Sequence, residues 1–143
     1  MSKVAVVYWS GTGNTEMMAQ KVAEGAKAAG AEVDVLTASE FGADKMDAYD
    51  AVAFGCPAMG AEELEDSEFE PMFSDCEGKL GGKKIALFGS YGWGDGEWMR
   101  NWVEQMEGAG ATVVGGEDTI CQEAPDADAQ DELKAMGKQL AAI

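Results

Sequence analysis

Histidine is absent from this sequence, and cysteine is scarce. The three cysteines, Cys56, Cys76 and Cys121, are widely spaced and form no CxxC pair, which disfavours both a disulfide framework and a zinc site. Without histidine, catalysis by a Ser-His or Cys-His pair, or by a histidine base, is excluded. We therefore expect neither a catalytic residue nor a bound metal.

Basic side chains are also few: Lys and Arg total 10, Asp and Glu total 27, and the formal net charge is −17. The acids concentrate in residues 61–78 and 117–132, which contain no Lys or Arg. Such a charge repels nucleic acid and anionic membranes and speeds encounters with basic protein surfaces. The same acidity could instead serve solubility alone, and both interpretations stay open.

Long apolar runs are lacking as well. No stretch approaches the roughly 20 apolar residues that cross a bilayer, and the first residues lack the basic and apolar segments of a signal peptide. The 143 residues and the hydrophobic content of 46% suit one domain with a sizeable core. We expect a cytoplasmic, monomeric protein with a single domain over residues 1–143.

Strand patterns alternate with amphipathic helical patterns along the chain. The strands are expected at residues 3–8, 32–36, 50–55, 84–89 and 111–114, the last of which could resume at 119–121. Helices are expected from Asn14 or Thr15 to Gly30, and around residues 69–76, 99–106 and 133–140. This alternation predicts a doubly wound α/β sandwich with a parallel sheet between two helical layers. Ligands bind such sheets at the carboxyl edge, so the loops after the first, third and fourth strands form the candidate site.

The loop after the first strand consists of small polar residues: Ser10, Gly11, Thr12, Gly13, Asn14 and Thr15. Its glycines expose backbone N–H groups, its side chains add neutral donors, and the following helix N-terminus favours an anion. The lysine of a triphosphate loop is missing, and position 16 is Glu rather than the last glycine of GxGxxG. The loop therefore predicts a site for a single terminal phosphate, and the alternative is a polar turn that only caps the helix.

The other two loops each combine glycine with a large apolar side chain. They read Cys56, Pro57, Ala58, Met59, Gly60, Ala61, Glu62 and Ser90, Tyr91, Gly92, Trp93, Gly94, Asp95, Gly96. Met59 and Trp93 could enclose a planar ring, or they could simply pack in the core. Gly60 can turn its carbonyl either way at low steric cost, and Glu62 could accept a hydrogen bond from a ring N–H or belong only to the acidic run. Cys56 is interpreted as a small buried residue without a redox role.

Taken with these loops, the chain resembles the short-chain flavodoxins over all 143 residues. SGTGNT is similar to that family's FMN phosphate loop, GSYGWGDG is similar to its second flavin loop, and TVVGGEDTIC carries no long insertion. The resemblance implies a five-stranded parallel sheet in the order 2-1-3-4-5 and non-covalently bound FMN. It also implies these contacts: Ser10, Thr12, Gly13, Asn14 and Thr15 hold the phosphate, Met59 and Trp93 flank the ring, Gly60 supplies a redox-linked carbonyl, Glu62 contacts the pyrimidine edge, Ser90, Tyr91 and Gly92 complete the second flavin loop, and Gly11, Pro57, Ala58 and Gly94 belong to the same loops.

The resemblance implies a low-potential, one-electron carrier that shuttles electrons between redox proteins with basic docking surfaces. Acids around the site would disfavour added negative charge on the flavin. The alternative is a small FMN-dependent NAD(P)H or quinone reductase, although 143 residues leave little chain for a second substrate pocket. A signalling receiver needs acidic residues at the end of its first strand, and this sequence has none there. A low-molecular-weight phosphatase needs a Cys and an Arg in its first loop, and both are missing here. We therefore expect a carrier rather than an enzyme.

Overall fold

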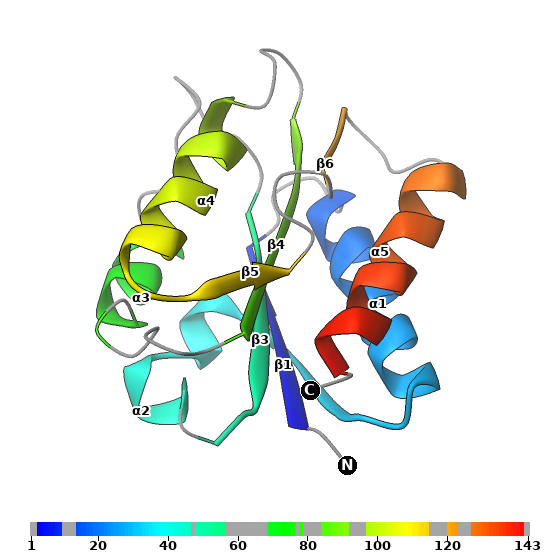
Figure 1. Ribbon diagram of the computed structural model, residues 1–143, viewed down its shortest axis with the longest axis horizontal. Coiled ribbons are helices and arrows are strands. Elements are labelled where there is room, and N and C mark those ends of the chain that lie inside the picture. The colour runs from blue at the N-terminus through cyan, green and yellow to red at the C-terminus, as the bar shows by residue number, and fades with distance from the viewer. Residues whose placement is uncertain are drawn as a thin grey trace.

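The strands form a parallel sheet with helices on both of its faces (Figure 1). The computed structural model describes residues 3–9, 14–46, 48–56, 69–76, 78, 84–91, 97–114, 120–122 and 127–141. The strands are β1 (Lys3–Tyr8), β2 (Glu32–Thr37), β3 (Ala51–Gly55), β4 (Lys84–Tyr91), β5 (Thr112–Val114) and β6 (Ile120–Gln122). Their order is β2-β1-β3-β4-β5, and β6 pairs with β4 beyond β5. The predicted fold class and strand order are confirmed.

The helices form the two outer layers of the sandwich (Figure 1). They are α1 (Asn14–Ala28), the 3-10 helix η1 (Ala38–Glu40), α2 (Ala43–Met46), α3 (Phe69–Cys76), α4 (Glu97–Gly108) and α5 (Ala127–Ala141). In the part of the chain that the structure describes, no helix is long and apolar enough to cross a membrane.

Alternate residues of the central strands supply two separate cores. On β1, Val4 and Val6 belong to the cluster under α1 and α5, whereas Ala5 and Val7 belong to the cluster under α2, α3 and α4. This two-residue period is the side-chain alternation of a strand. Because both faces are covered, the strand reads in the sequence as one continuous apolar run.

The helical spacing of α3 and the end of α1 confirm two details of the sequence interpretation. Phe69, Met72, Phe73 and Cys76 of α3 are all buried, as one apolar helix face requires. Gly30 has φ 93°, a left-handed conformation that closes α1, and its N–H donates to the carbonyl of Lys27 at 2.9 Å. The N–H of Ala31 donates to the carbonyl of Ala26 at 3.1 Å, which completes the C-cap and turns the chain into β2.

Helices α1 and α5 cross at very close range, and two glycines permit it. A Cβ atom at Gly137 would overlap the carbonyl oxygen of Val22 and lie 2.9 Å from the N atom of Ala26. A Cβ atom at Gly25 would likewise overlap the carbonyl oxygen of Lys134. The backbones therefore approach each other where neither helix has a side chain, which fixes the position of α1 above the sheet.

Candidate cofactor site at the carboxyl edge of the sheet

The chain leaves three neighbouring strands at the carboxyl edge of the sheet: β1 after Tyr8, β3 after Gly55 and β4 after Tyr91. These three chain exits lie side by side, because hydrogen bonds continue past the strand ends. Tyr8 is in register with Gly55, and the N–H of Trp9 donates to the carbonyl of Gly55 at 3.0 Å. The N–H of Cys56 donates to the carbonyl of Phe88 at 3.1 Å. The strand order reverses between β1 and β3, so this edge is the place where open α/β sheets bind ligands.

The first exit leads directly into α1. The helix begins at Asn14, one of the two residues predicted to cap it, and Ser10, Gly11, Thr12 and Gly13 lie outside the described residues. Thr15 is buried, with 1% of its surface exposed, and no other polar or charged residue is buried within the described ranges. The N-terminus of a helix carries a positive partial charge that favours an anion, and a threonine in the first turn adds a neutral hydroxyl group.

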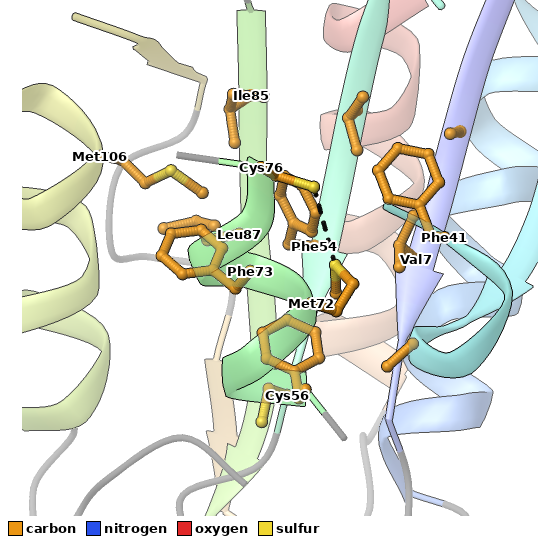
Figure 2. Close-up of a cluster of buried hydrophobic side chains, with 14 of the residues drawn as sticks. Val7, Phe41, Phe54, Cys56, Met72, Phe73, Cys76, Ile85, Leu87 and Met106 are labelled. Carbon is orange, nitrogen blue, oxygen red and sulfur yellow. Dashed lines mark hydrogen bonds between the residues drawn. The ribbon is translucent and has the colours of Figure 1, made fainter. Parts of the chain in front are cut away.

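The second exit follows Gly55 and Cys56. Cys56 is fully buried in the core cluster beside α3, which confirms its interpretation as a packed strand-end residue (Figure 2). Pro57, Ala58, Met59, Gly60 and Glu62, the predicted ring and pyrimidine contacts, lie outside the described residues.

A second thiol, that of Cys76, lies deeper in the same core. Its Sγ donates to the Sδ atom of Met72, one turn earlier on α3, at 3.9 Å (Figure 2). Burial raises the pKa of the Cys76 thiol to about 12, and the nearby Asp75 and Asp44 carboxylates add to the effect. The thiol is therefore neutral and inert at physiological pH.

The third exit is a strand that continues beyond the others. β4 ends at Tyr91, two residues later than the sequence pattern indicates, so Ser90 and Tyr91 are strand residues. They pair with Cys121 and Gln122 of β6, while the pairing of β3 with β4 ends at Phe88. Gly92, Trp93 and Gly94, the rest of the predicted flavin loop, lie outside the described residues.

The direction of the β4 peptide groups shows what this extension offers. The carbonyl of Phe88 faces β3, where it accepts the Cys56 N–H. Because peptide groups alternate in direction along a strand, those of Ser90 face the same side, beyond the end of β3. The N–H and the carbonyl of Ser90 thus face the space beyond the end of β3, next to the point where the chain leaves that strand.

Acidic groups surround the β1 end of this edge. Burial raises the pKa of the Tyr8 hydroxyl, and the nearby Glu16 and Glu40 carboxylates raise it further. Glu40 is held in place by hydrogen bonds from the N–H of Thr37 at 2.9 Å and from its Oγ1 at 3.0 Å, which also lower the pKa of Glu40. Glu40 was not among the candidate residues predicted from the sequence, although the spacing Thr37-Ala38-Ser39-Glu40 is a capping box that could have placed it.

These features define the class of the protein: a doubly wound α/β protein in which the N-terminus of α1 and the ends of β3 and β4 lie at the carboxyl edge of the sheet, where open α/β sheets bind ligands. The donors identified there are neutral hydroxyl and backbone groups, and they fit FMN. No cluster of three or more metal-ligating side chains occurs within the described ranges.

Comparison with known proteins gives the family. The sequence model of the flavodoxin family matches residues 6–137. The chain is 50% identical to the flavodoxin of Megasphaera elsdenii over 96% of this chain and 98% of that one. It is 48% identical to the flavodoxin of Clostridium beijerinckii over 96% and 99% of the two chains. The solution structure of two-electron reduced Megasphaera elsdenii flavodoxin superposes with a TM-score of 0.90, at 49% identity and over 98% and 99% of the two chains. The chain therefore belongs to the flavodoxin family, and its cofactor is FMN.

Proposed function

We propose that this protein is a low-potential carrier of single electrons between redox proteins, and that residues 10–15, 57–60, 62 and 90–94 bind its FMN. The observation that carries the proposal is the meeting of three loop exits at the reversal of strand order, in a chain 50% identical to a flavodoxin. The family consists of FMN-binding electron carriers, which supports a carrier rather than a catalyst. We further propose that residues 1–143 act as one monomeric domain in the cytoplasm.

FMN, when bound, supplies the electron-transfer chemistry, and the chain supplies its binding and its electrostatic surroundings. The N-terminus of α1 and the neutral donors from Ser10 to Thr15 hold the phosphate. Met59 and Trp93 enclose the ring, Glu62 accepts from its pyrimidine edge, and the peptide groups of Ser90 orient it. Glu16 and Glu40 place negative charge near the site, which makes additional negative charge on the ring less favourable and lowers the potential.

The partners of such a carrier are expected to dock through basic surfaces. A formal charge of −17 steers basic proteins toward this chain and gives fast, weak encounters. Salt screens these forces over about 8 Å at physiological ionic strength, so the rate of electron transfer to a basic partner falls as salt is added.

The test begins with the purified chain and FMN. We expect the flavin absorption bands, quenched flavin fluorescence, and an affinity for FMN that exceeds that for riboflavin. Thr12→Ala should weaken FMN more than riboflavin, whereas Thr112→Ala, an exposed residue of β5, is the control and should change neither affinity. A chain that takes up no FMN, or that binds FMN and riboflavin equally, contradicts the proposed site.

The carrier activity is tested by stopped-flow mixing of the reduced, FMN-loaded chain with a basic c-type cytochrome. Its rate should fall with ionic strength, whereas the rate with ferricyanide, an anionic acceptor, should rise. Equal salt dependence for the two acceptors contradicts electrostatic docking. Steady oxidation of NAD(P)H by the loaded chain alone would instead favour the reductase function.

A further inference from the structure

We propose that β6 is a positioning strand for the cofactor site, and that the backbone of Cys121 is the group through which it acts. This inference rests on the proposed function, because it concerns how tightly the same site binds FMN. It assigns no flavin contact to β6. Instead, β6 holds the extension of β4 from which Ser90 presents its peptide groups.

The pairing of β4 changes along its length. On one side, β3 pairs with residues Lys84–Phe88 and then ends. On the other side, β5 pairs with residues Lys84–Ala86, and β6 pairs with Gly89–Tyr91. Within the described ranges, β6 is therefore the strand that pairs with the last three residues of β4, and Figure 1 shows it beside the end of that strand.

The register identifies which peptide groups make this contact. Because those of Phe88 face β3, those of Gly89 and Tyr91 face β6. Cys121 lies opposite Ser90, between these two residues, so in a parallel ladder its N–H donates to the carbonyl of Gly89 and its carbonyl accepts from the N–H of Tyr91. The neighbouring Gln122 turns its N–H away from β4.

This contact matters for binding because an unpaired extension of three residues must otherwise be ordered when FMN binds. The apparent dissociation constant is the intrinsic one divided by the fraction of molecules in the competent conformation. Pairing with β6 raises that fraction before FMN arrives. Loss of one ladder bond should weaken FMN binding by about tenfold, which corresponds to about 1.4 kcal/mol.

Two proline variants of neighbouring residues test the inference. Cys121→Pro removes the N–H that faces Gly89, whereas the control Gln122→Pro removes an N–H that faces away, which an edge strand tolerates. We expect the dissociation constant for FMN to rise about tenfold in Cys121→Pro relative to Gln122→Pro. Because the lost bond also belongs to the FMN-free fold, the urea midpoint of FMN-free Cys121→Pro should lie slightly below that of Gln122→Pro, and amide exchange of Tyr91 should be faster in FMN-free Cys121→Pro.

Equal FMN affinity in the two folded variants, or unchanged exchange of the Tyr91 amide, overturns the inference. If Cys121→Pro does not fold, the parent chain decides: the Tyr91 amide must already be protected from exchange before FMN is added, and unprotected exchange in the FMN-free chain overturns the inference. If the parent binds no FMN, the proposed function fails, while amide exchange in the FMN-free variants still tests the role of β6.

Discussion

Substitution of Gly55 by Ala tests how the core supports the candidate site. Gly55 is the last residue of β3, and the ring of Phe88 on β4 covers its Cα. A Cβ atom added there would lie 2.7 Å from Cδ2 of Phe88 and closer still to the outer ring atoms. Ordinary contacts begin near 3.4 Å, so the buried ring would have to retreat by about 1 Å or more.

The magnitude follows from two opposing effects. Overpacking of a core costs about 1–3 kcal/mol, whereas replacement of a strand glycine by alanine returns about 0.5–1 kcal/mol. Gly55→Ala should therefore lower the free energy of unfolding by about 1–2 kcal/mol. With a urea m value of about 1–3 kcal/mol/M, the midpoint should fall by roughly 0.3–2 M. FMN affinity should fall too. Gly55 and Phe88 are followed directly by Cys56 and Gly89, so a shift of either residue displaces the chain that leads into the candidate site.

The assay is urea unfolding of the FMN-free chain, followed by circular dichroism, as a double-mutant cycle with Phe88→Leu. If the ring causes the cost, Gly55→Ala should cost at least 1 kcal/mol less when Leu replaces Phe88, because the smaller side chain leaves room. Additivity of the two substitutions within about 0.5 kcal/mol would refute the proposed clash. An unchanged midpoint for Gly55→Ala alone would refute the reasoning about packing.

The remaining predictions concern helix packing and pH. Gly137→Ala should destabilise the chain by about 1–3 kcal/mol in urea unfolding, because its methyl group would overlap the carbonyl of Val22. The control is Gly108→Ala on α4, which has open space around the added methyl group and should stabilise the chain by about 0.5–1 kcal/mol. Burial, and then the hydrogen bond from the Tyr49 hydroxyl to Asp34 at 2.8 Å, raise the pKa of Tyr49 from 10.0 to about 12. The neutral phenol thus stabilises the fold below pH 10, and this contribution is lost as the pH rises toward 12. Unfolding curves for Tyr49→Phe should therefore show a smaller loss of stability over this range than the parent, and an equal loss contradicts the assignment.

The parts of the fold that the sequence predicts are those in which local pattern and tertiary packing agree. The apolar spacing of Phe69, Met72, Phe73 and Cys76 shows where α3 lies, and the structure buries each of these side chains against the sheet. Gly30 ends α1 because a left-handed residue is needed there. These signals lie within one turn or one strand, so they require no knowledge of distant residues.

The segment between β2 and β3 was not predicted. Its helices, η1 and α2, span three and four residues, too few to show a helical period or to form alone in water. They are held instead by long-range burial: Phe41 and Met46 pack in the core under α3, and the ring of Phe41 lies 6.1 Å from that of Phe54. Apart from the capping box at Thr37, such elements depend on long-range contacts that no local pattern records.

The candidate site divides in the same way. Residue types in its loops predicted a phosphate and a ring, because those types carry the donors and apolar surfaces that such a ligand requires. The orientation of the Ser90 peptide groups depends on the hydrogen bond between Cys56 and Phe88 and on the register of β6. The sequence pattern predicts that β4 ends at residue 89, because Gly89, Ser90 and Tyr91 do not continue the apolar run. In the structure, pairing with β6 extends β4 to Tyr91.

Among the described residues, no charged side chain is buried in the two cores. The two cores are apolar and aromatic, with Trp102 packed edge-on to Phe69 and Phe73 at 5.4 and 5.7 Å between ring centroids. The ion pair between Lys21 and Glu24 on α1 is 3.1 Å long, with Glu24 exposed and Lys21 partly exposed, and ion pairs at the surface contribute little to stability. Acidic side chains that accept no structural hydrogen bond, unlike Asp34 and Glu40, can therefore vary with small effects on folding. A selective loss of affinity or rate with basic partners, at unchanged stability, is thus the signature by which a docking role for these acids would be recognised.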